Sequence, residues 1–100
     1  MVDFSRVTGF DWDAGNERKS LDRHSVSQAE AQQVFECPNL LVSDDIKHSD
    51  VEVRNQALGE TFEGRKLHVT FTPRRNDTLI RVISARDMNA KEKTAYAKEA

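Results

Sequence analysis

Apolar and polar residues alternate most regularly in the stretch "KLHVTFT", where every second position is apolar. Successive side chains of a strand point to opposite faces of a sheet. The apolar positions that would share one face are Leu67, Val69 and Phe71. The positions on the other face are His68, Thr70 and Thr72. This pattern predicts a sheet with one face packed on helices and the other available to solvent or a ligand.

Two turn sequences divide the surrounding region into three strands. "FEG" precedes the alternating stretch and "PRRND" follows it, so residues 52–85 predict an antiparallel meander. The short apolar run Leu40–Val42 adds a fourth strand. Phe10–Trp12 also have the character of a short strand.

Two helices are predicted before the meander. Asp13 is a suitable N-cap for a helix that extends to about Arg23. Ser27 stands three residues before Glu30, which is the spacing of a capping box. The second helix therefore starts at this pair, and Pro38 ends it.

A third helix is predicted at the C-terminal end. Asn89 precedes Glu92 by three residues, and the run "AKEKTAYAKEA" is rich in helix formers. The element order predicts an α+β fold with two N-terminal helices, a four-stranded largely antiparallel sheet and a C-terminal helix. Because 100 residues is the size of one domain, we expect residues 1–100 to form a single unit.

The last predicted strand, "TLIRVISAR", raises a question about two arginines. Arg81 lies within its apolar run and Arg86 lies at its end. Burying an unpaired guanidinium costs several kcal/mol, so each arginine must pair with an acid, reach water or face an anionic ligand.

Charge is distributed unevenly along the chain. The net charge is −2 with a pI near 5.9, which argues against a general nucleic-acid binder that relies on phosphate neutralisation alone. Acidic residues gather in "SDDIKHSDVE", whereas basic residues fall in the hairpin region after it. These basic residues are Arg65, Lys66, Arg74, Arg75, Arg81 and Arg86.

The remaining composition narrows the classes of protein. No long apolar run is present, and Asp3 and Arg6 stand where a signal peptide would be apolar, so a soluble, cytoplasmic protein is expected. Cys37 is the only cysteine, which excludes an internal disulfide. The four glycines are too scattered for a phosphate-binding loop, and the three histidines show no metal-ligand spacing, so we expect no cofactor and no metal.

Metal-independent RNA cleavage fits the histidines and arginines better than the other chemistries do. The 2′-hydroxyl attacks the neighbouring phosphorus, so an enzyme needs a base, an acid and cations that stabilise the phosphorane. Arginine suits the last role because its planar fork binds two phosphate oxygens. The candidate catalytic residues are His48, Arg54, Arg65, Arg81 and Arg86. In the competing interpretation, which composition alone favours, these arginines pair across the sheet with Glu52, Glu60, Glu63 or Asp77.

Five stretches in order resemble the BrnT family of toxins from bacterial type II toxin–antitoxin modules, over residues 10–96. They are "FDWD", "RHSVSQAEAQQVF", "HSDVEVRNQALGET", "GRKLHVTFTPR" and "IRVISARDMNAKEKTAY". The resemblance implies a compact RelE-like fold and a metal-independent ribonuclease that halts translation. It also implies a small BrnA-like antitoxin with a ribbon-helix-helix part, so that the complex represses its own operon.

The resemblance also suggests roles for individual residues. Arg81 and Arg86 match the family's strand arginines, and His48 matches its histidine for proton transfer. Further residues expected to contact RNA are Arg23, Arg74, Arg75 and Tyr96, although Tyr96 would equally suit packing of the last helix. The chain departs from the family pattern at Asn16, Ser20, Arg23 and Ser25. An alternative function is therefore a catalytically weak or inactive module that binds the antitoxin without cutting RNA.

Overall fold

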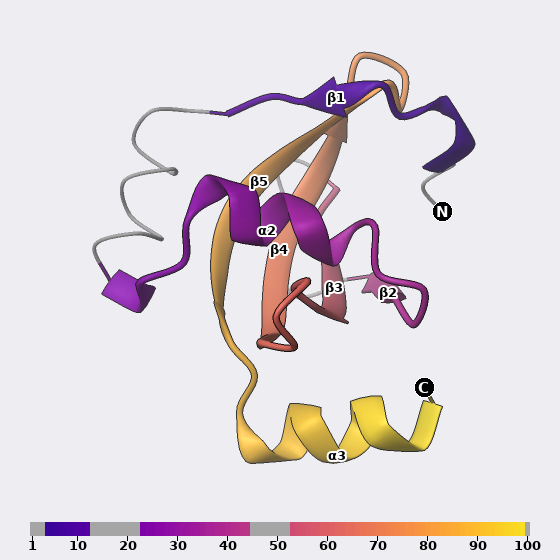
Figure 1. Ribbon diagram of the computed structural model, residues 1–100. Coiled ribbons are helices and arrows are strands. Elements are labelled where there is room, and N and C mark those ends of the chain that lie inside the picture. The colour runs from indigo at the N-terminus through magenta and orange to yellow at the C-terminus, as the bar shows by residue number, and fades with distance from the viewer. Residues whose placement is uncertain (1–3, 13–22, 45–52, 100) are drawn as a thin grey trace.

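The computed structural model describes residues 4–12, 23–44 and 53–99 and shows a five-stranded mixed sheet in the order β1-β5-β4-β3-β2 (Figure 1). The strands are β1 Gly9–Phe10, β2 Leu41–Asp44, β3 Asn55–Glu60, β4 Lys66–Arg74 and β5 Leu79–Asp87. The helical elements are the 3-10 helix η1 Phe4–Arg6 and the α-helices α2 Gln28–Val34 and α3 Ala90–Glu99. None of the helices in these ranges is both long and apolar enough to cross a membrane.

The strand count corrects the predicted four-stranded sheet. The three-strand meander is present as β3, β4 and β5, and β2 pairs antiparallel with β3. The fifth strand, β1, pairs parallel with the start of β5 through Gly9↔Leu79 and Phe10↔Ile80. A two-residue strand carries too short a pattern to reveal its partner about 70 residues away, so the parallel edge was not foreseen.

The helices follow their capping signals where the structure describes them. Ser27 and Glu30 form the predicted capping box at the start of α2, with Glu30 N to Ser27 Oγ at 3.1 Å and Ser27 N to Glu30 Oε1 at 3.0 Å. Asn89 and Glu92 make the same reciprocal bonds before α3, at 2.8 and 2.9 Å. The predicted first helix falls mainly on residues 13–22, which lie outside the described residues, so two α-helices rather than three have described bounds.

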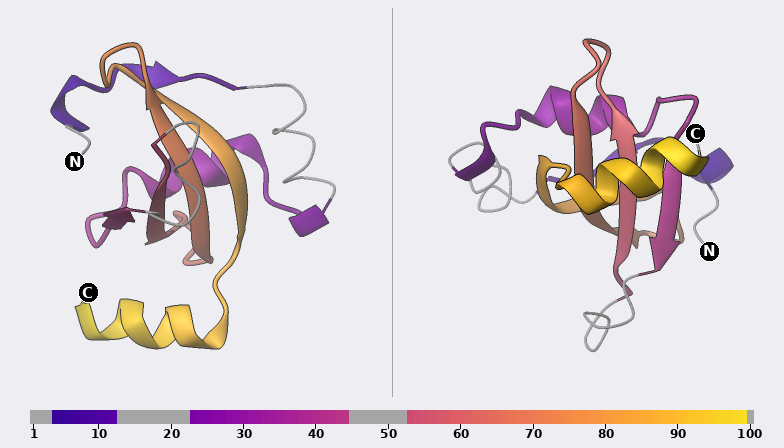
Figure 2. Two further views of the ribbon diagram at one scale, coloured as in Figure 1. Left: turned by 180° about the vertical axis from the view of Figure 1, so that it is seen from behind. Right: turned by 90° about the horizontal axis from the view of Figure 1, so that it is seen from below.

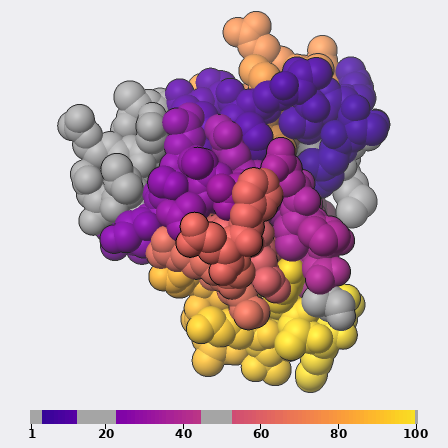
Figure 3. Space-filling model, viewed as in Figure 1, coloured from indigo at the N-terminus to yellow at the C-terminus, as the bar shows by residue number. Residues whose placement is uncertain are grey.

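The core lies between α2 and one face of the sheet. Ala31 and Val34 of α2 are buried against β3 and β4. Four phenylalanines extend this core toward η1 and β1, with ring centroids 5.0–6.2 Å apart: Phe4, Phe10, Phe35 and Phe71. The space-filling view shows α2 and the turn after β3 covering this side of the molecule (Figure 3). The apolar face of "KLHVTFT" is therefore the core face, as its pattern predicts.

Helix α3 crosses one end of the sheet instead of packing on the core face (Figure 2). Of its ten residues, all of them described, Tyr96 alone is buried, with 2% of its surface exposed. The Tyr96 hydroxyl lies 3.4 Å from Cys37 Sγ, just beyond α2. This contact joins α3 to the helix on the core face.

Gly59 of β3 marks the closest approach between α2 and the sheet. A Cβ built on Gly59 would lie 2.9 Å from Val34 Cγ1 and 3.1 Å from the Val34 carbonyl oxygen. The carbonyl belongs to the α2 backbone and cannot rotate away. The helix therefore lies directly on the strand backbone at this position.

We expect Gly59→Ala to destabilise the fold by about 1–3 kcal/mol, because the added methyl overpacks this contact. Gly9→Ala is the matched control, since its nearest neighbour would be Leu79 Cδ2 at an ordinary 3.6 Å. Urea unfolding followed by circular dichroism measures both. Equal stability of the two variants would mean that α2 shifts freely on β3.

Candidate functional site

A β-bulge decides which side of the sheet carries the strand arginines. Thr70 pairs with Ser84, but Phe71 pairs with Val82, so Ile83 is an extra residue on β5. Arg81 and Arg86 are five positions apart and would face opposite sides of a regular strand. The extra residue shifts the alternation by one and brings both side chains to the same face.

We call this side of the sheet the arginine face. Cross-strand partners share a face, so the β4–β5 register defines it on the side away from α2. Its residues are His68, Thr70, Thr72 and Arg74 of β4 and their partners Arg86, Ser84, Arg81 and Leu79 of β5. From Arg74 to His68 it extends for six residues along β4, or about 20 Å.

Arg86, Glu92 and His68 meet where the arginine face reaches α3. Both terminal nitrogens of Arg86 donate to the Glu92 carboxylate, at 2.8 and 2.9 Å. His68 is the ladder partner of Arg86, and its Nε2 lies 3.6 Å from Glu92 Oε2. We call these three residues the Arg86 cluster. It joins two neighbouring strands and the first turn of α3.

The electrostatics of the Arg86 cluster keep Glu92 charged at neutral pH. Burial raises the pKa of Glu92, but hydrogen bonds from Arg86 and from the Asn89 backbone N–H outweigh this effect and lower it below its ordinary value. The same hydrogen bonds with Glu92 raise the pKa of Arg86. A carboxylate therefore lies in the fork of Arg86, in the geometry that a phosphate would adopt.

The arginine face is more covered than the sequence pattern predicts. His68 is 6% exposed and Thr72 is 2% exposed. Glu92 approaches His68 from α3, and the Thr72 hydroxyl donates to the carbonyl oxygen of Val53, just before β3. Alternation fixes the direction of a side chain but does not show which distant segment lies over it.

Arg81 is anchored at the other end of the face. Its NH2 group donates to Asp11 Oδ2 at 2.9 Å, which ties β5 to the residue that follows β1. Its Nε is buried and has no hydrogen-bond partner among the described residues. Arg81 thus has an acidic partner for one part of its guanidinium only.

Arg65 has a different environment from the other predicted catalytic arginines. Its Nε and NH2 bind the two carboxylate oxygens of Asp87 at 2.8 and 3.1 Å. NH1 donates to Glu30 Oε2 and to the Ser25 carbonyl oxygen, and NH2 also donates to the His24 carbonyl oxygen. These five bonds use all five N–H donors of the guanidinium. The geometry favours a structural role for Arg65 over the predicted catalytic one.

The other predicted site residues lie apart from the Arg86 cluster or outside the described ranges. Arg54 lies immediately before β3 and Arg74 ends β4, and both are half-buried. Arg75, in the β4–β5 turn, and Arg23, before α2, are exposed. His48 lies outside the described residues.

Tyr96 lies in a packing position. Burial raises its pKa, and the contact with Cys37 adds to this effect, so the hydroxyl stays protonated at neutral pH. With its ring buried and its hydroxyl directed to Cys37, Tyr96 fits the predicted alternative of packing α3 better than contact with RNA.

The acidic partners are what sequence reasoning missed. Arg65 pairs with Asp87 and Glu30, Arg81 pairs with Asp11, and Arg86 pairs with Glu92. None of these acids is among the cross-strand partners that the competing interpretation named. Two of these acids, Glu30 and Glu92, have a sequence signal as helix-capping residues, but a capping signal does not show which arginine the carboxylate will bind. Within the described ranges, no group of three or more His, Cys, Asp and Glu side chains is arranged to hold a metal ion.

Comparison with protein families shows the family of the chain. Residues 12–92 match the family model described as "Ribonuclease toxin, BrnT, of type II toxin-antitoxin system". The chain belongs to the BrnT toxin family. The match begins two residues after β1, covers α2, strands β2 to β5 and the Arg86 cluster, and ends in the first turn of α3.

A solved BrnT structure has the same fold. The crystal structure of the Brucella abortus ribonuclease toxin BrnT matches with a TM-score of 0.63 and 20% sequence identity, covering 83% of this chain and 99% of that one. No curated protein matches the sequence. Membership of a type II toxin–antitoxin family implies an antitoxin partner for this BrnT-family chain.

We expect Arg65→Gln to lower the free energy of unfolding by about 1–3 kcal/mol, because it leaves two carboxylates and two carbonyls without their donor. Arg65 holds the pKa of Asp87 below its ordinary value, and the Ser27 backbone N–H together with Arg65 does the same for Glu30. Because the pKa of each carboxyl group is lower in the folded state than in the unfolded state, its ionised form stabilises the fold above the ordinary pKa of about 4. The stability gap to wild type should therefore narrow as the pH falls from about 5 to about 2.

Urea unfolding across this pH range tests the role of Arg65. Arg75→Gln, at an exposed turn position, is the control and should stay within about 0.5 kcal/mol of wild type. A gap that is absent, or that does not change with pH, would contradict a structural role for the Arg65 ion pairs.

Proposed function

We propose that this BrnT-family chain is an endoribonuclease toxin that cleaves RNA without a metal ion and thereby inhibits translation. The observation that supports this best is the Arg86 cluster, in which a forked guanidinium and a histidine meet on one sheet face. Guanidinium groups supply the positive charge that phosphoryl chemistry requires, and histidine is the commonest group for proton transfer.

In the proposed reaction the 2′-oxygen of a ribose attacks the adjacent phosphorus. The 2′-oxygen to phosphorus bond forms, the bond from phosphorus to the 5′-oxygen breaks, and charge builds up on the phosphorane oxygens. Arg86 stabilises that charge through two parallel N–H bonds, with Arg81 further along the same face. A base takes the 2′-hydroxyl proton and an acid protonates the leaving 5′-oxygen, and we assign His68 to one of these steps.

Glu92 controls access to Arg86 in this proposal. Its carboxylate forms the same bidentate contact that a phosphate would form, so RNA must displace it. Displacement also uncovers His68, since Glu92 lies 3.6 Å from its Nε2. Binding of RNA and opening of the cluster are thus a single exchange of anions at Arg86.

The remaining predicted residues take different parts in the proposal. Arg54 and Arg74 are assigned to the RNA track, because Arg74 lies on the arginine face and Arg54 follows Val53, whose carbonyl binds Thr72 on that face. Arg23 and Arg75 are exposed and would contact RNA only beyond this face. His48 stays a proposed proton-transfer residue.

We also propose that the antitoxin is a BrnA-like protein with a ribbon-helix-helix DNA-binding part. Such a partner would neutralise the toxin by covering the arginine face, and the complex would bind operator DNA through the antitoxin. The family's class supports the partner. The charge of the arginine face supports the docking site, because complementary charges steer association.

The alternative is a module that binds the antitoxin without cutting RNA. The ion pairs favour it to a degree, since Arg86 and Arg81 already have carboxylate partners at 2.8–2.9 Å. Growth after induction of the chain without its antitoxin separates the two functions. A ribonuclease arrests growth, whereas a binding module does not.

We expect Arg86→Gln to reduce RNA cleavage about 10²–10³-fold, because it removes the donor pair aimed at the phosphorane. Glu92→Gln retains Arg86 and the helix cap, since glutamine also serves in a capping box, and should bind a non-cleavable oligonucleotide more tightly than wild type. Cleavage of a labelled RNA in excess chelator measures the first effect, and fluorescence anisotropy measures the second.

Lys98→Gln, at an exposed position near the end of α3, serves as the control for loss of positive charge and should cleave like wild type. Circular dichroism checks that Arg86→Gln is folded. Full cleavage by folded Arg86→Gln would remove this arginine from the mechanism. Loss of wild-type cleavage in chelator, restored by one divalent ion, would replace the arginine mechanism with a metal-dependent one.

Hydrogen exchange of the chain with and without its antitoxin tests the docking site. Protection should concentrate between Arg65 and Arg86, which spans both strands of the arginine face. High salt should slow association more than it speeds dissociation, because charged contacts steer the encounter. Protection confined to residues before β2 would show that inhibition works from the α2 side.

A further inference from the structure

A basic hollow lies at the end of the β4–β5 ladder, beyond the Arg86 cluster. Its volume is about 660 Å³. Its walls come from the turn before β4, the end of β5 and the first turns of α3. The lining residues, which we call the lysine hollow, are Gly64, Arg65, Lys66, Asp87 and Lys93.

The two lysines carry the net charge of the lysine hollow. Arg65 and Asp87 neutralise each other through two hydrogen bonds, and the other Arg65 donors are also occupied. Lys66 and Lys93 are exposed, and neither ammonium group makes an ion pair with the described residues. The hollow therefore presents two exposed cations beside the Arg65–Asp87 pair, and Lys93 is close enough for its charge to help lower the pKa of Asp87.

Each element that builds the Arg86 cluster also supplies a residue to the lysine hollow. On β4, Lys66 comes two positions before His68 and so shares its direction. On α3, Lys93 follows Glu92 directly. Two residues along a strand span about 7 Å, which is comparable to the spacing of successive phosphates in an RNA strand. The hollow thus lies where the next phosphate of a strand bound along the arginine face would be.

The residues that line the hollow favour binding of a phosphate over binding of a protein partner. Stable protein docking sites usually contain apolar or aromatic anchors, and the four side chains beyond Gly64 that line this hollow are all charged. Lysine binds phosphate as a mobile point charge and needs no fixed fork geometry. Two ammonium groups at an open hollow suit the negatively charged backbone of a single strand.

We propose that the lysine hollow binds the phosphate of the RNA strand that neighbours the one held at Arg86. This subsite rests on the proposed ribonuclease function and extends it. It implies that the RNA must continue for at least one more phosphate beyond the linkage that is cut. Lys66 and Lys93 contact that phosphate, and Arg65 holds the wall between them through its bonds to Asp87 and α2.

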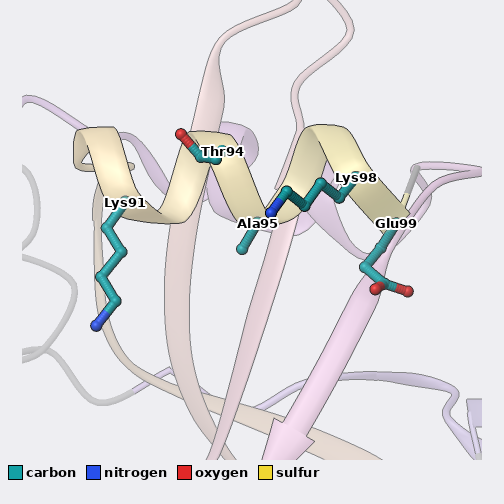
Figure 4. A pocket seen from close by; sticks show the side chains of 5 residues that line it. All are labelled: Lys91, Thr94, Ala95, Lys98 and Glu99. Carbon is teal, nitrogen blue, oxygen red and sulfur yellow. The ribbon is translucent and has the colours of Figure 1, made fainter.

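The test compares two double variants with equal loss of charge. Lys66→Gln with Lys93→Gln removes the hollow's cations. Lys91→Gln with Lys98→Gln removes two lysines that line a shallow hollow along another side of α3 (Figure 4). Lys93 lies two residues after Lys91, about 200° around the helix. Exposed substitutions of this kind change stability by at most about 0.5 kcal/mol, so both variants should fold.

The probe is a single-stranded DNA oligonucleotide, which carries the same phosphates but lacks the 2′-hydroxyl and is not cleaved. Binding is measured by fluorescence anisotropy over a range of salt concentrations. Losing the contact to one phosphate should reduce the slope of log K against log salt by about 0.7 in Lys66→Gln/Lys93→Gln, since each neutralised phosphate of a single strand contributes about 0.7. The control should keep the wild-type slope, and a dinucleotide too short to reach the hollow should bind all three proteins alike.

Three results would overturn the proposal. An equal change of slope in both double variants would mean that the slope depends on the overall charge of the protein and not on the hollow. An unchanged slope in Lys66→Gln/Lys93→Gln would mean that no phosphate enters the hollow. Normal oligonucleotide binding with lost antitoxin binding would assign the hollow to the antitoxin. If the slope changes as expected but wild type cuts no RNA, the phosphate subsite stands and the ribonuclease function fails.

Discussion

The saturated guanidinium of Arg65 is the interaction on which the rest of this fold depends. It joins the start of α2, the segment before it and the end of β5, three parts of the chain that no continuous sheet or helix connects. Glu30 caps α2 and accepts from Arg65, and Asp87 at the end of β5 accepts from the same guanidinium, so Arg65 links the helix start to the strand end. Both the turn into α3 and the position of the Arg86 cluster follow from where β5 ends.

The arginine face results from two departures from regular structure acting together. The extra residue at Ile83 turns Arg81 and Arg86 to the same side, and α3 then brings Glu92 over the second of them. In a regular strand one arginine would face the apolar core, where an unpaired charge costs several kcal/mol. The bulge therefore keeps both arginines out of the apolar core and places them together on the arginine face.

The sequence reveals those parts of this structure that local patterns determine. The Ser27–Glu30 box, the turn at "PRRND" and the alternation through Val69 lead directly to α2 and the β4–β5 hairpin. The bulge has no such signal, because any residue of "RVIS" can take the extra position. The partner of Arg81 is Asp11, 70 residues away, and the short strand that brings it there is not strongly patterned. The basic residues were thus visible in the sequence, and the acids that hold them were not.

The exposure of α3 has a consequence for how this protein can change over generations. Tyr96 alone anchors the helix in the interior, and Glu92 alone links it to the Arg86 cluster. Most of its other positions can vary without disturbing the core, so selection is able to remodel this surface while the scaffold stays constant.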